Sequence, residues 1–63
     1  MTSKRTKEAV AFWMAEANVA ALRELRIRLR LAELLGGPYE SDMRALLADA
    51  THTRERAERE LSQ

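Results

Sequence analysis

The sequence contains no cysteine, one proline and two glycines, and one copy each of phenylalanine, tryptophan and tyrosine. Without cysteine, the chain has neither a disulfide framework nor a thiolate metal site, which are the usual supports of very small domains. Long apolar runs are also missing, because the longest, residues 9–15, has 7 residues and a membrane-spanning helix needs about 20. We therefore expect one cytoplasmic domain over residues 1–63, with residues 1–5 frayed and no membrane partner.

The abundant residues favour α-helix. Eleven alanines, nine leucines, nine arginines and eight glutamates dominate the chain, and most of them are strong helix formers. Thr6 is a suitable N-cap for a first helix over about residues 6–35, which the Gly-Gly-Pro sequence at 36–38 then ends. Ser41 is a suitable N-cap for a second helix over about residues 42–61. The short connection predicts an all-α antiparallel helical hairpin.

The apolar residues of the two expected helices are distributed differently. The second helix has one apolar side with the alternating four- and three-residue spacing of a coiled coil, consisting of Met43, Leu47, Ala50, Arg54, Ala57 and Leu61. The first helix has two apolar stripes on nearly opposite sides. One stripe contains Val10, Met14, Ala17, Asn18, Ala21, Leu22, Leu25, Leu29, Ala32 and Leu35. The other contains Trp13, Ala20, Ile27, Leu31 and Leu34.

A single neighbouring helix covers only one of the two stripes, and exposed apolar strips of this size are rare in monomers. We therefore expect a homodimer or larger homo-oligomer, most simply a four-helix bundle of two hairpins. Within the apolar sides, Asn18 would fix the register of the oligomer, while Arg54 would reach a carboxylate or extend its end to solvent. The residues expected in the oligomer interface are Trp13, Met14, Asn18, Ala20, Ala21, Leu25, Ile27, Leu34, Met43, Leu47 and Leu61.

Three arginines form a ridge along the first helix, at the spacing that places Arg23, Arg26 and Arg30 on one side. Phe12 and Val19 lie close to the same line, and an exposed aromatic side chain beside arginine is typical of protein-contact surfaces. We therefore expect a small interaction or regulatory module that binds a protein partner. The alternative is a nucleic-acid-binding regulator whose arginine ridge follows phosphates, although a net charge of +1 also fits arginines that pair with acidic neighbours.

Residues 25–31 alternate apolar and arginine side chains, which is also the pattern of a β-strand. As a strand, this segment resembles the DNA-reading ribbon of ribbon-helix-helix repressors, a resemblance that implies a dimeric DNA-binding fold. As a hairpin, the chain resembles Rop-type RNA-binding bundles in length and layout, without a matching motif. Continuous helix across residues 22–35 is the interpretation that we prefer.

The sequence has no set of residues that would support catalysis, such as a glycine-rich phosphate loop or a nucleophile with a neighbouring base. Asp49 and His52 have the spacing of the Glu-x-x-His element of ferritin-like di-iron bundles. His52 lies opposite the apolar side of its helix, however, which indicates a solvated surface histidine. We therefore expect a protein that is not an enzyme and holds no metal and no cofactor.

Overall fold

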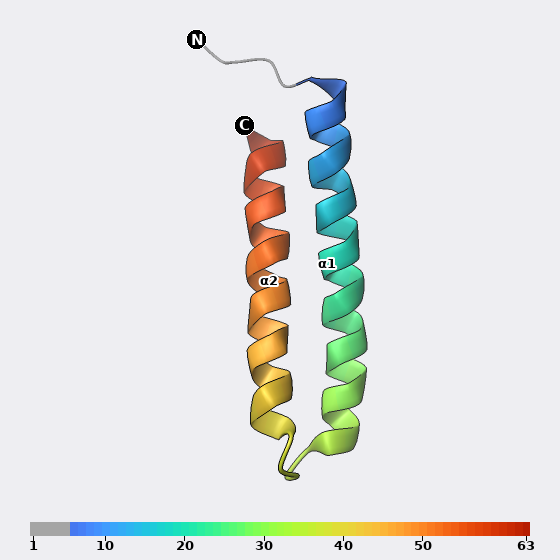
Figure 1. The fold of residues 1–63 in the computed structure, drawn as a ribbon, viewed down its shortest axis with the longest axis vertical. Helices are drawn as coiled ribbons and strands as arrows, with labels where there is room; N and C mark the ends of the chain where they lie inside the picture. The colour runs from blue at the N-terminus through green and yellow to red at the C-terminus, as the bar shows by residue number, and fades with distance from the viewer. Residues whose placement is uncertain (1–5) are drawn as a thin grey trace.

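The computed structural model describes residues 6–63, which form two long helices packed side by side (Figure 1). Helix α1 spans Lys7–Leu34 and helix α2 spans Glu40–Ser62. They run antiparallel, so the C-terminus lies near the start of α1, and the hairpin measures 50 × 17 × 11 Å. The predicted helical hairpin is confirmed, and the expected fraying of residues 1–5 falls outside the described residues.

Residues 25–31 lie inside α1 and are helical throughout. The alternative of a β-strand in this segment is therefore wrong. Its alternating pattern has a different origin, since the leucines and the isoleucine belong to two opposite sides of the helix and the arginines lie between them.

The start of α1 and the turn after it follow the sequence signals. The side-chain oxygen of Thr6 accepts a hydrogen bond from the backbone N–H of Ala9 at 3.0 Å, as expected of an N-cap. Gly36, just beyond the end of α1, has a φ of +78°, a left-handed conformation that costs glycine little. The N–H of Gly37 then bonds to the carbonyl of Leu34 at 3.0 Å. The glycine pair therefore closes the helix as predicted.

The prediction that Ser41 caps the second helix is wrong, because α2 begins at Glu40 and its N-cap is Tyr39. Tyr39 makes no side-chain capping bond, and its carbonyl accepts the first helical bond from Met43 at 3.0 Å. The carboxylate of Glu40 reaches back across the turn and accepts a hydrogen bond from the N–H of Gly36 at 2.8 Å. This long side chain ties the turn to the first residue of α2, which starts the helix before Ser41.

Small residues form the centre of the hairpin. In residues 6–63 the buried positions are Ala20, Ala50, Ala57 and, at 3% exposed, Glu24, and no large apolar side chain is fully buried. Alanines at the contact line let two helix backbones approach closely, because interaxial distance depends on the side chains between them. The hairpin consequently buries little apolar area for its length.

Helix α2 covers the stripe of α1 that begins with Trp13. The buried and half-buried residues of α1 include a series with four- and three-residue spacing, which we name the inner seam. The inner seam consists of Trp13, Ala17, Ala20, Glu24, Ile27, Leu31 and Leu34. The facing residues of α2 are the predicted ones, Met43, Leu47, Ala50, Arg54, Ala57 and Leu61, all buried or half-buried.

Candidate functional site

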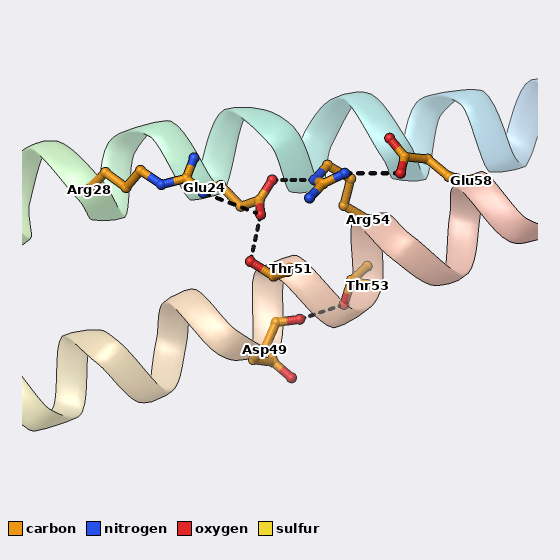
Figure 2. A network of polar contacts seen from close by, with 7 residues as sticks. All are labelled: Glu24, Arg28, Asp49, Thr51, Thr53, Arg54 and Glu58. Carbon is orange, nitrogen blue, oxygen red and sulfur yellow. Dashed lines mark hydrogen bonds and ion pairs between the residues drawn. The ribbon is translucent and has the colours of Figure 1, made fainter.

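A polar network joins the two helices at the middle of the hairpin (Figure 2). Glu24 of the inner seam is 3% exposed, and its two carboxylate oxygens accept from different side chains of α2. The hydroxyl of Thr51 donates to Oε2 and Nε of Arg54 donates to Oε1, both at 2.5 Å. Arg54 also bridges to Glu58 at 2.9 Å, and Arg28 lies 3.9 Å from Glu24. Glu24 thus satisfies both oxygens although water hardly reaches it.

The network changes the proton affinity of its members. The hydrogen bonds from Thr51 and then Arg54 hold the pKa of the Glu24 carboxyl below its usual value, against the opposing effect of burial. The carboxylates of Glu24 and then Glu58 raise the pKa of Arg54. Both residues are therefore charged at neutral pH, and together they act as a paired charge within the helix interface.

The sequence predicts that Arg54 either reaches a carboxylate or extends to solvent, and in the structure it reaches the carboxylate of Glu24. The role of Glu24 was missed at the sequence level. Its position was visible in the spacing, because it lies four residues after Ala20 and three before Ile27. The sequence signal for this ion pair is one acidic residue on an apolar stripe of the first helix and one basic residue on the apolar side of the second.

The side of α1 that faces away from α2 is apolar and exposed. Each position two residues before a member of the inner seam lies about 200° further round the helix, on the opposite side. We name this series the outer seam: Ala11, Ala15, Asn18, Leu22, Leu25, Leu29 and Ala32. All seven are exposed, and its three leucines have exposed fractions of 48%, 54% and 64%. No polar side chain other than Asn18 interrupts it.

The predicted interface residues divide into two groups. One group lies between the two helices of the single chain and consists of Trp13, Ala20, Ile27, Leu34, Met43, Leu47 and Leu61, which are buried or half-buried. The other group lies on the exposed part of α1 and consists of Met14, Asn18, Ala21 and Leu25. The second group is accessible to another chain without disturbing the hairpin.

The residues predicted to bind a partner lie along one edge of α1. Phe12 and Val19 are 54% and 55% exposed. Phe12 packs edge-on against Trp13, with ring centroids 4.9 Å apart, and the guanidinium of Arg56 lies 5.6 Å from the centroid of Trp13. The tryptophan therefore fixes the position of the exposed phenylalanine and is itself contacted from α2.

The three arginines of the ridge differ in the ion pairs that they form. Arg23 lies 3.9 Å from Asp49 of α2, and Arg30 lies 3.4 Å from Glu33 of its own helix. Arg26 forms no ion pair within residues 6–63. The exposed ion pairs of this ridge contribute little stability and exchange readily for other partners.

The remaining chemical features of the described chain are sparse. His52 is exposed on α2, and residues 6–63 contain no group of three His, Cys, Asp or Glu side chains arranged to hold a metal ion. Neither helix in this range is long and apolar enough to cross a bilayer. An open depression beside the outer seam is lined by Arg26, Leu29, Arg30 and Glu33. The most prominent chemical feature of the described surface is therefore the apolar outer seam, with the arginine ridge running beside it.

No protein-family model matches this sequence, and searches among curated proteins and among solved structures found no match either.

Proposed function

We propose that this protein is a small non-enzymatic interaction or regulatory module, which acts as a homo-oligomer and binds a protein partner through the exposed surface of α1. The observation that supports this proposal is the exposed apolar outer seam. Contiguous apolar surface of this kind marks interaction sites in soluble proteins. The hairpin also has a core of alanines and no fully buried large side chain among residues 6–63, so further burial in an assembly would add stability.

The partner-binding edge consists of Phe12, Val19 and the arginine ridge. Phe12 presents an apolar ring whose position is set by Trp13, which lowers the entropy lost on binding. The exposed arginines further along the same side of α1 add hydrogen-bond donors at the rim of the contact. An acidic or mixed apolar–acidic surface is the complement of this edge.

A pull-down with the tagged full chain tests the partner-binding proposal. Phe12→Ala should lose the captured protein, because it removes the apolar anchor while leaving the inner seam intact. His52→Ala is the matched control, since His52 is exposed on α2 and lies away from the edge. Equal capture by wild type and Phe12→Ala would contradict the role of this edge.

A nucleic-acid-binding regulator is the second candidate, favoured by Arg26, which has no ion-pair partner within residues 6–63 and lies between Arg23 and Arg30 with their long ion pairs. Three exposed arginines on one side of a helix can follow phosphates. A gel shift with DNA and RNA at low salt tests it, together with the Arg23/Arg26/Arg30→Ala triple variant. Salt-sensitive binding that the triple variant loses would support this candidate, and absence of binding at low salt would exclude it.

A further inference from the structure

We propose that the outer seam is covered by α1 of a second copy of this chain, lying antiparallel to the first. The inference rests on the proposed homo-oligomer and names the surface and orientation of its contact. The two α1 helices would lie in the middle of a four-helix row, with each α2 on the outside. This arrangement follows from the geometry of α1, whose inner and outer seams lie on opposite sides and therefore cannot both face the centre of a square bundle.

The spacing of the outer seam fits a helix as its occupant. From Ala11 to Ala32 it keeps the four- and three-residue alternation of a coiled coil without a break, over a length of about 32 Å. A two-fold symmetric dimer uses the same patch on both copies, so a surface that complements itself suffices. The outer seam has the length, spacing and exposure for such a contact.

The sizes of the side chains favour the antiparallel orientation. Ala11 and Ala15 occupy the N-terminal part of the outer seam, and Leu25 and Leu29 occupy its C-terminal part, which ends at Ala32. In an antiparallel pair centred near Ala20, Ala11 and Ala15 of one copy face Leu29 and Leu25 of the other, and Asn18 faces Leu22 next to the centre. In a parallel pair, Ala11 and Ala15 would face the same alanines in the N-terminal half, and Leu25 and Leu29 would face the same leucines in the C-terminal half. The interaxial distance would then have to change along the dimer, because it depends on the side chains in contact.

The charges of α1 favour the same orientation. Residues 7–20 contain one basic and two acidic side chains, a net charge of −1. Residues 21–34 contain four arginines and two glutamates, a net charge of +2. Antiparallel packing places the acidic half of each helix beside the basic half of the other, whereas parallel packing places the two basic halves together. The opposed helix dipoles add to this preference.

Pulsed electron paramagnetic resonance distinguishes the orientations, because the chain has no cysteine and each introduced one is the sole labelling site. Spin labels at Glu33→Cys should lie about 40 Å apart in the antiparallel dimer, and labels at Ala21→Cys should lie close together near the two-fold axis. A parallel dimer would give short distances at both sites and would overturn the proposed orientation. Absence of any defined distance at Ala21→Cys would overturn the contact itself.

A seam variant tests which surface is used. Leu25→Glu would place a charge in the contact of each copy and should weaken dimerisation by about 100-fold or more, with helicity retained, because Leu25 is exposed in the hairpin. Ala48→Glu, on the exposed side of α2, is the matched control and should leave the dimer intact. A wild-type chain that is a helical monomer by light scattering, or a Leu25→Glu chain that remains a dimer, would overturn the proposal. Neither result would affect the Phe12 pull-down, which tests the protein-partner proposal separately.

Discussion

Glu24 of α1 and Arg54 of α2 are joined by a 2.5 Å ion pair in the centre of the helix interface, where the carboxylate is only 3% exposed. Each residue occupies a position of the apolar seam of its own helix, and the two seams place them at matching heights (Figure 2). A shift of α2 by one heptad would separate the two charges, leaving the buried Glu24 carboxylate with only Arg28 of its own helix and Arg54 with only Glu58, which is unfavourable for a carboxylate that water hardly reaches. The pair therefore favours a single register of the hairpin.

Removing one member of this pair should destabilise the hairpin more than removing both. Arg54→Leu leaves the Glu24 carboxylate in the interface without its main charged partner, and Glu24→Leu leaves Arg54 with Glu58 alone from α2. We expect each single variant to lower the Tm by about 5–10 °C. The double variant should recover most of the loss, because two leucines suit a helix interface. Thermal unfolding followed by circular dichroism measures this, and additive losses would contradict the coupling of the two residues.

Stability should fall in acid because two carboxyl groups have lowered pKa values in the folded chain. Thr51 and Arg54 lower the pKa of Glu24, and the N–H of Gly36, followed by Arg44, lowers the pKa of Glu40. A folded pKa below the ordinary value of 4.5 gives stabilisation that is present above that value and is lost as the pH falls through the folded pKa. We therefore expect little change in Tm between pH 7 and about pH 5 from these two groups, and a decline below about pH 4.5.

Glu24→Gln tests the assignment of this acid sensitivity. The variant should be less stable than wild type at neutral pH and should lose less stability between pH 5 and pH 3. Glu55→Gln, exposed on the outside of α2, is the matched control and should keep the wild-type profile. Identical pH profiles of wild type and Glu24→Gln would contradict a contribution from this carboxyl group.

Thr6 and Ser41, the two residues that the sequence suggests as N-caps, should differ in how much stability is lost when each is replaced by alanine. Thr6→Ala removes the observed bond to the N–H of Ala9 and should lower the free energy of unfolding by about 1 kcal/mol. Ser41→Ala should change it by less than about 0.5 kcal/mol, because Ser41 lies inside the first turn of α2. Urea unfolding compares them, and a larger loss for Ser41→Ala would contradict the observed start of α2.

The left-handed conformation of Gly36 predicts that substitutions at this position lower the free energy of unfolding by amounts that depend on the new residue. Alanine at this position meets no atom within 4 Å, so its cost arises from the φ of +78° alone and should be about 1–2 kcal/mol. Gly36→Asn should cost less, because asparagine tolerates this conformation better. A Gly36→Ala chain as stable as wild type by urea unfolding would show that the turn can adopt another conformation.

The parts of the fold that depend on neighbouring residues were predictable from the sequence. Thr6 as the N-cap, the end of the first helix at the Gly-Gly-Pro turn and the single apolar side of α2 follow from propensity, capping and spacing, which act over a few residues. The start of α2 was misplaced by two residues, because the carboxylate of Glu40 bonds across the turn to Gly36. That contact competes with the local capping signal of Ser41.

The choice between the two stripes of α1 required the folded hairpin. Both stripes are apolar and helical in spacing, so no local rule distinguishes the Trp13 stripe from the outer seam. The contacts that distinguish them join residues far apart in sequence, above all Glu24 with Thr51 and Arg54. The amino-acid sequence thus determines a helical hairpin with more apolar surface than one partner helix covers. The tertiary packing assigns one stripe to the hairpin and exposes the other, because only one side of α1 carries the carboxylate that pairs with the charge on α2.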